Sequence, residues 1–171
     1  MSDRPRRIEP GPGQESVWDY PRPPAVVPTT DRVRVVHGGI VVADTRAAVR
    51  VLETSQPPAY YLPRADVRAD LLRRTETRSV CEWKGAATYW SLVLPDGHGG
   101  TDAVADVAWS YEQPTERFAA IAGHLAFYAQ RVDDCWVDDE RVQPNPGSFY
   151  GGWITSRIVG PFKGAPGTSG W

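Results

Sequence analysis

Residues 78–94 read RSVCEWKGAATYWSLVL, and this stretch decides the fold that the sequence predicts. It is too rich in β-branched and aromatic residues for a good helix, so we expect a turn followed by one buried strand. If the chain has a pocket, this stretch supplies the residues that we expect to line it, which are Cys81, Trp83, Lys84, Tyr89 and Trp90.

Shorter strand patterns flank this stretch on both sides. Apolar residues alternate over 33–35 and resume at 40–43, and the Gly38-Gly39 pair between them predicts a hairpin, because tight turns of this kind need positive φ. Residues 104–111 alternate too, and we expect Trp109 on this strand to meet Trp90 on the central one. Further strands are expected at 47–51, 60–62 and 71–72, with a last hairpin at 136–142.

Only residues 115–125 favour a helix. Thr115 is a suitable N-cap, Phe118, Ile121, Ala122 and Leu125 follow the helical period, and Gly123 is a suitable stop. Because a two-turn helix ending at Gly123 is short, the alternative is that residues 124–128 form a strand. Many short strands with one short helix predict a mainly β fold, a single domain of rolled or tent-like antiparallel sheets.

The two ends of the chain differ from the middle in composition. We expect residues 1–31 to form an extended Pro-rich arm pinned to the body by Trp18 and Tyr20. Residues 32–143 form the β-rich core domain in this prediction, and residues 144–171 form a Gly- and Pro-rich tail packed on it. Trp153, Phe162 and Trp171 are the expected anchors of the tail, which would run over the same body as the arm.

Charge and hydropathy exclude several classes of function. The net charge of −2 argues against nucleic acid as a partner, and no apolar stretch is long enough to span a bilayer. Cys81 and Cys135 lie far apart without a Cys-x-x-Cys spacing, and no hydrophobic leader precedes them. We therefore expect free thiols and a cytoplasmic protein.

Several short motifs resemble one family. They are Tyr61-Leu62-Pro63-Arg64, residues 79–85 (SVCEWKG), Ala87-Thr88-Tyr89, residues 108–111 (AWSY) with Pro114, and residues 124–128 (HLAFY). Together they are similar to the domain of unknown function 427 family over roughly residues 33–142. The Cys-x-Trp-Lys-Gly core is the most specific part, although family members commonly have Pro where this chain has Glu82. The Pro-rich front and the tail from Gly152 to Gly164 resemble extensions of actinobacterial-type members.

This resemblance implies a β-rich fold similar to the Mss4-like or β-tent group, some members of which bind zinc. A structural zinc site needs four Cys or His ligands in close pairs, and this chain has two cysteines and three histidines without that spacing, so we expect neither metal nor cofactor. The family is also labelled nucleotidyltransferase-like. The tail around Lys163, however, lacks the Gly-x-x-x-x-Gly-Lys-Ser/Thr pattern of a phosphate-binding loop.

The candidate site combines a reactive set with an aromatic set. Cys81 is a candidate nucleophile, Lys84 would activate it if both face one cavity, and His124 would serve as the base. The residues that would bind the ligand are Tyr60, Arg64, Trp83, Tyr89, Trp90 and Trp109.

Two functions remain open on the sequence. The first is a small-molecule-binding protein with an aromatic-lined pocket, whether or not it is also an enzyme through Cys81, Lys84 or His124. The second is a non-catalytic binding module that self-associates through its arms, in which case the rings form only a core and the protein is a homo-oligomer.

Overall fold

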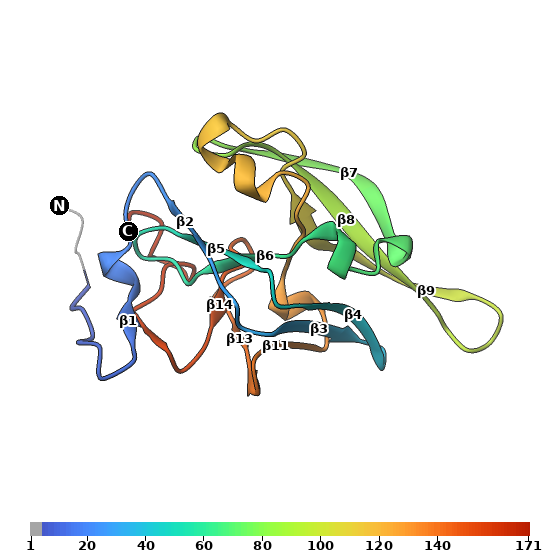
Figure 1. Ribbon diagram of the computed structural model, residues 1–171, viewed down its shortest axis with the longest axis horizontal. Coiled ribbons are helices and arrows are strands. Elements are labelled where there is room, and N and C mark those ends of the chain that lie inside the picture. Colours follow the sequence, from blue (N-terminus) through green and yellow to red (C-terminus); the bar gives the residue numbers. More distant parts are fainter. Residues whose placement is uncertain (1–4) are drawn as a thin grey trace.

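Three long antiparallel strands organise the chain, which is described over residues 5–171 by a computed structural model (Figure 1). They are β7 (Leu72–Cys81), β8 (Gly85–Pro95) and β9 (Thr101–Ser110), and β10 (Ala126–Phe127) pairs with the outer side of β9. The stretch at 78–94 is therefore a hairpin: Cys81 ends β7, residues 82–84 turn, and Gly85 begins β8 with φ of 100°. The prediction of a turn followed by a strand is confirmed.

The long sheet is bent by two irregularities that face each other across β8. One lies in β7 between Arg74 and Arg78, and the other lies in β9 opposite residues 90–92, where Asp106 has φ of 49°. The hydroxyl groups of Thr75 and Thr77 each donate a hydrogen bond of 2.7 Å to the Asp106 carboxylate. The bulged segments are thus tied to one another, and bulges of this kind re-aim the side chains next to them.

A second four-stranded sheet has the order β12-β11-β3-β4. Its strands are β3 (Val33–His37), β4 (Ile40–Thr45), β11 (Asp134–Val137) and β12 (Glu140–Arg141). Gly38 and Gly39 connect β3 to β4 with φ of 57° and 76°, so the predicted hairpin and its cause are confirmed. The hairpin expected at 136–142 is also present, as β11 and β12.

A third sheet, in the order β2-β5-β6, completes the framework. It consists of β2 (Ala25–Pro28), β5 (Val49–Leu52) and β6 (Ala59–Tyr61). Because β2 lies within residues 1–31, the segment expected to be an arm supplies one strand of this sheet.

Short strand pairs attach the two ends of the chain to each other and to the body. β1 (Glu15–Ser16) pairs in parallel with β15 (Ile158–Val159), and β13 (Gln143–Pro144) pairs with β14 (Trp153–Ile154). Trp18 donates a hydrogen bond of 2.9 Å to the carbonyl of Pro161, while Tyr20 packs with Ile158 and Phe162. The front and the tail therefore lie side by side, as expected (Figure 1).

The helical prediction is wrong in type and in length. Residues 115–125 contain a 3₁₀ helix, η4 (Glu116–Ile121), which is interrupted at Phe118 and followed by Gly123 with φ of 68°. The remaining helices between residues 5 and 171 are also short 3₁₀ turns: η1 (Val17–Asp19), η2 (Arg64–Asp66), η3 (Ala69–Leu71) and η5 (Ala129–Arg131). Leu125 pairs with Leu62 as a β-bridge, so the helical period ends where strand pairing begins. None of these helices has the length and apolar character needed to cross a membrane.

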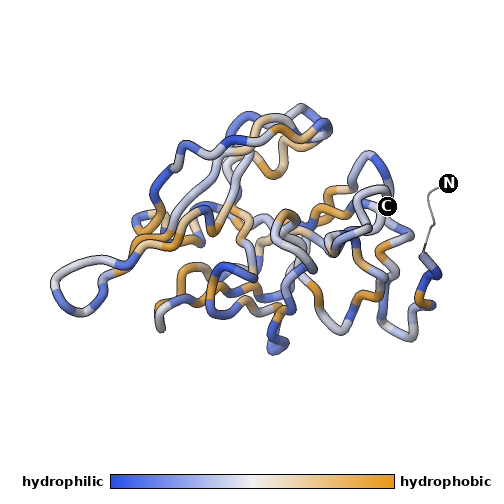
Figure 2. Tube along the Cα trace, turned by 180° about the vertical axis from the view of Figure 1, so that it is seen from behind, coloured by the Kyte–Doolittle hydropathy of each residue, from blue (hydrophilic) through white to orange (hydrophobic). Residues whose placement is uncertain are grey.

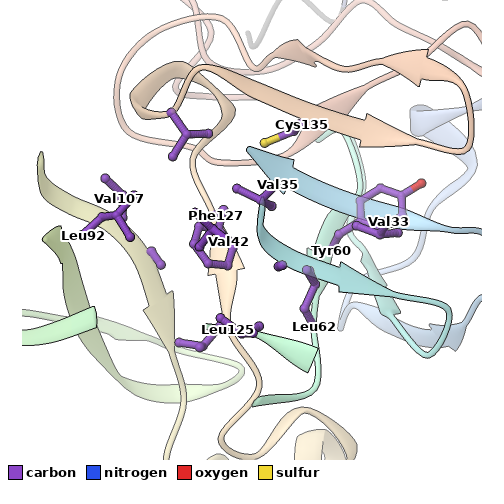
Figure 3. Packing of buried hydrophobic residues seen from close by; sticks show 14 of the residues in the cluster. Val33, Val35, Val42, Tyr60, Leu62, Leu92, Val107, Leu125, Phe127 and Cys135 are labelled. Carbon is purple, nitrogen blue, oxygen red and sulfur yellow. The ribbon is translucent and has the colours of Figure 1, made fainter. Parts of the chain in front are cut away.

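The main core lies between the long sheet and the β3–β4 hairpin. Leu92 and Val107 come from one side, Val33 and Val35 come from the other, and Phe127 lies between them (Figure 3). All five side chains are completely buried. The loop between β8 and β9, in contrast, extends beyond the rest of the molecule and carries no hydrophobic stretch (Figure 2). The fold is a mainly β single domain whose long sheet is anchored at one face and free at its hairpin end.

We expect the Asp106→Ala substitution to lower the free energy of unfolding by about 2 kcal/mol, because it removes two charge-assisted hydrogen bonds that hold the bulges. Chemical denaturation will measure the loss. Asp102→Ala removes an exposed carboxylate from the same strand and should change stability by less than about 0.5 kcal/mol. Equal effects of the two substitutions would contradict a structural role for Asp106.

Candidate functional site

A cavity of about 320 Å³ lies between the long sheet and the β5–β6 pair. Its floor comes from β7, β8 and β9, its opposite wall comes from Val51, Ala59 and Tyr61, and the tail borders it at Phe149–Gly152 and at Lys163. Three segments that are far apart in the sequence therefore share one hollow.

Strand register decides which side chains of the long sheet face this cavity. Tyr89 on β8 is the direct partner of Trp109 on β9, and on the other side of β8 Cys81 pairs with Gly85 and Ser79 with Ala87. Because directly paired residues share one face of an antiparallel sheet, the Cys81 thiol, the Tyr89 phenol and the Trp109 indole lie on the same side. The hydroxyl groups of Tyr89 and Ser79 are 2.8 Å apart and fix the Tyr89 ring.

Aromatic rings form the deep part of the cavity. The Trp109 ring centroid lies 6.1 Å from that of Tyr61 in an edge-on arrangement, and 4.6 Å from that of Tyr128. The Trp109 indole nitrogen also donates a hydrogen bond of 3.1 Å to the Tyr61 hydroxyl. The N–H group of the buried indole therefore has its hydrogen-bond partner within the cavity wall. The faces of the rings form an apolar surface.

The turn at residues 82–84 supplies the entrance. Its conformation is held by Thr115, whose hydroxyl donates to the Trp83 carbonyl at 2.6 Å and whose amide donates to the Lys84 carbonyl at 3.2 Å. The Lys84 ammonium lies 5.6 Å from the centroid of the Tyr111 ring, within the range of a cation–π contact. Thr115 thus positions the turn instead of capping a helix.

The tail closes the other side through close backbone contacts. A Cβ atom on Gly151 would collide with the Trp109 ring, and one on Gly152 would collide with the Pro57 carbonyl, so both positions need glycine. Gln130 donates a hydrogen bond of 3.1 Å to the Tyr150 carbonyl and secures the same loop. The tail is thereby packed directly against the rings of the cavity.

The buried phenols stay neutral at physiological pH. Burial raises the pKa of Tyr61, of Tyr111 and of Tyr128 well above the usual value, and hydrogen bonding of Tyr128 to Tyr89 adds to the effect there. Each of these hydroxyl groups therefore keeps its proton to a higher pH than an exposed tyrosine does.

Five of the residues predicted from the sequence line this cavity together: Cys81, Trp83, Lys84, Tyr89 and Trp109. Cys81 is a free thiol of intermediate exposure, whereas the second cysteine, Cys135, is buried in the main core. Two of the three candidate catalytic residues thus meet at the cavity.

The structure places the other four predicted residues elsewhere. Trp90 pairs with Ala108, not with Trp109, so its ring lies on the opposite face of the sheet, where it donates a 2.9 Å hydrogen bond to Ser110. Arg64 stacks over this ring and is bound to Glu112 and to the Gly123 carbonyl. The expected meeting of Trp90 with Trp109 is therefore wrong, because β8 is aligned so that Tyr89 takes that position.

His124 and Tyr60 also lie outside the cavity lining. The His124 ring approaches the Ala122 carbonyl at 3.3 Å, next to the Gly123 turn. Tyr60 stacks on Trp153 in the main core, with ring centroids 5.1 Å apart, and its neighbour Tyr61 faces the cavity instead. Adjacent residues of a strand point to opposite faces, so only one of the two tyrosines can reach the site.

Sequence reasoning missed Tyr61, Tyr128 and the tail residues, including Lys163. One signal was available: of the 19 lysine and arginine residues in the chain, only Lys84 and Lys163 are lysines. Both line the cavity.

Within residues 5–171, no cluster of three or more His, Cys, Asp or Glu side chains is arranged to hold a metal ion. The polar side chains that line the cavity include a thiol, two ammonium groups and several phenol hydroxyls.

Alkaline pH should destabilise the protein through these phenols. Below about pH 10 both the folded and the unfolded chain hold the Tyr61 proton, but at higher pH only the unfolded chain releases it, so the stability falls as the pH rises. Tyr61→Phe should reduce this slope by at most about 1.4 kcal/mol per pH unit. Denaturation curves above pH 10, with phenolate absorbance recorded in parallel, will test this; an unchanged slope would show that Tyr61 ionises in the folded state.

Comparison with known families gives one match. A family model described as a domain of unknown function (DUF427) matches residues 25–138, which is well over half of the chain. A comparison with curated proteins found no match. The matched region contains every strand from β2 to β11, and with them the floor and the turn of the cavity, whereas the tail residues lie outside it. The chain belongs to the DUF427 family of domains of unknown function.

Proposed function

We propose that this protein binds a small organic ligand with a flat apolar body in the cavity between the long sheet and the β5–β6 pair. The observation that carries the proposal is the combination of a hollow of about 320 Å³ with walls made of aromatic rings. Small-molecule sites are usually concave and mostly apolar, with a few convergent polar groups, and they start at about 300 Å³.

The exposure of the lining rings supports this role. Trp109 and Tyr111 are 8% and 6% exposed and form the deep wall, whereas Trp83 and Tyr89 are only partly buried. Rings that served the core alone would be covered by other side chains. Here two of them keep surface that a stacked ligand would remove from water, which favours binding by about 25 cal/mol per Å² of apolar area.

Catalysis at the same cavity is the second candidate function. Cys81 and Lys84 both line it, so a bound ligand would lie beside a thiol and an ammonium group. His124 does not line it and has no part in this version of the proposal. The reaction would be an addition to a carbonyl-bearing ligand: the thiol proton of Cys81 leaves to solvent, the sulfur forms a bond to the carbonyl carbon, and the C=O π pair moves onto the oxygen, which takes up a proton.

A fluorescent apolar probe tests the binding proposal. Uncharged phenylnaphthylamine should bind to the wild-type protein with one-to-one stoichiometry and increased emission. Trp83→Ala should weaken binding about tenfold, which corresponds to about 1.4 kcal/mol, because it removes one ring from the entrance. Fluorescence titration will measure both affinities.

Trp136→Ala is the matched control, since Trp136 is a partly buried indole on β11 outside the cavity lining. Its affinity should equal that of the wild type. If neither substitution changes the affinity for the probe, the proposal is contradicted.

Sedimentation of the same samples tests self-association. A dimer that excludes the probe would favour the interaction module, because Val80 and Phe149 at the cavity are 81% and 74% exposed and would be covered in such a dimer.

Alkylation distinguishes the two thiols. Iodoacetamide should modify Cys81 in the folded protein and leave Cys135 unmodified until the chain unfolds, because Cys135 is 2% exposed and burial raises its pKa. Bound phenylnaphthylamine should slow the reaction at Cys81. Peptide mass spectrometry will locate the label; modification of Cys81 at the same rate with and without bound probe would place the thiol away from the ligand.

A further inference from the structure

Lysine is used in an unusual way in this chain. Nearly all of its basic side chains are arginines, and both of the lysines that it has border the same cavity. Lys84 comes from the β7–β8 turn inside the region matched by the family model, and Lys163 comes from the tail outside it. Two separate segments therefore bring the same functional group to one place.

Both ammonium groups rest on aromatic rings of the cavity lining. Lys84 lies 5.6 Å from the Tyr111 ring centroid, and Lys163 lies 5.4 Å from that of Tyr150. Neither lysine forms an ion pair with another residue in the range 5–171, where the cations of nearly all ion pairs are arginines. Among the described residues, no carboxylate is therefore close enough to form an ion pair with either ammonium group.

The carboxylates near the cavity do not change this balance. Glu53 accepts a hydrogen bond of 2.8 Å from Gln56 and lies 3.8 Å from the Arg22 guanidinium, so its charge is already compensated. Glu82 is exposed on the turn. The charged groups of the lining that have no ion-pair partner among the described residues are therefore two cations, Lys84 and Lys163, and one exposed anion, Glu82.

Lysine suits this position for a physical reason. Its ammonium is a compact point charge on a flexible apolar stem, so the stem can lie along a ring while the charge moves to meet an anion. Tyr61 and Tyr111 also line the cavity, and a phenol hydroxyl is a hydrogen-bond donor at neutral pH. An acidic group would find cations and hydrogen-bond donors here, and Glu53, the largely buried carboxylate of the lining, already faces the Arg22 guanidinium.

From these observations we infer that the ligand class is an aromatic acid, whose flat body lies on the rings and whose charge is neutralised by the ammonium groups of Lys84 and Lys163. Lys163 is then a specificity-determining residue that the tail adds to the family domain. This inference rests on the proposed function, and it adds a requirement for negative charge that an apolar ligand site would not have.

A matched pair of probes tests the inference. Anilinonaphthalene sulfonate has the same aromatic body as phenylnaphthylamine and adds one negative charge. At constant ionic strength the wild-type protein should bind the sulfonate about tenfold more tightly than the neutral probe, as expected for hydrogen bonds between charged groups.

Lys84→Met and Lys163→Met keep the length of the stem and remove the charge. Each should lower the ratio of sulfonate affinity to phenylnaphthylamine affinity by about three- to tenfold. Lys163→Arg should keep most of the sulfonate affinity. Arg46→Met, which removes an exposed cation outside the cavity lining, is the control and should affect neither probe.

The outcomes separate the two proposals. If both probes bind equally well and neither lysine substitution changes the ratio, the inference about charge is overturned while the proposed apolar site stands. The inference is also overturned if the sulfonate is preferred but Lys84→Met and Lys163→Met retain that preference. If neither probe binds, the proposed function fails and the inference fails with it.

Discussion

The alignment of β8 between β7 and β9 is the constraint on which the site depends. Pairing of Tyr89 with Trp109 puts both rings on one face, together with the Cys81 thiol at the end of β7. A shift of one residue would exchange these side chains for Trp90 and its neighbours, because the side chains of a strand alternate between faces. The bulges beside Asp106 lie at the same level of β8 and hold this alignment. The bulges in β7 and β9 therefore help to maintain the register in which β8 pairs with both strands.

A buried indole is one of the anchors of the tail. Trp153 is 1% exposed, stacks on Tyr60 and donates a hydrogen bond of 2.8 Å to the Phe127 carbonyl, so it fixes the chain at the strand that precedes the Tyr128 ring. The two glycines before it then pass close to the Trp109 ring and to Pro57. Since the wall of the cavity is built from these contacts, the tail is part of the site and not an appendage to the family domain.

The groups that line the cavity differ in how deeply they are buried. Burial stabilises the neutral form of each phenol, and the indole of Trp109 is satisfied by Tyr61 within the wall. The ammonium group of each lysine lies beside a ring of the cavity lining, and both lysine residues are partly exposed. The lining thus combines buried rings with partly exposed cations.

Much of the fold was predictable because it follows from local patterns. The Gly38-Gly39 hairpin, the strands at 33–45 and 136–142, and the turn and strand within 78–94 are all determined by short-range preferences for strand and positive φ. The motif that places Cys81, Trp83 and Lys84 within four residues of one another also predicted three neighbouring residues of the cavity lining. The helix was overestimated, because the apolar period at 118–125 is shared between a 3₁₀ turn and a β-bridge at Leu125.

What the sequence by itself determined is therefore where strands and turns lie and which reactive groups share one turn. Only the tertiary structure decided between the adjacent pairs Tyr60 and Tyr61, and Tyr89 and Trp90, because both faces of these strands are covered by other parts of the chain and no polar alternation marks the inner side. It also decided that Lys163 and Lys84 line the same cavity. The two positions are far apart in the chain and are brought to one cavity by the packing of the tail, which no local preference encodes.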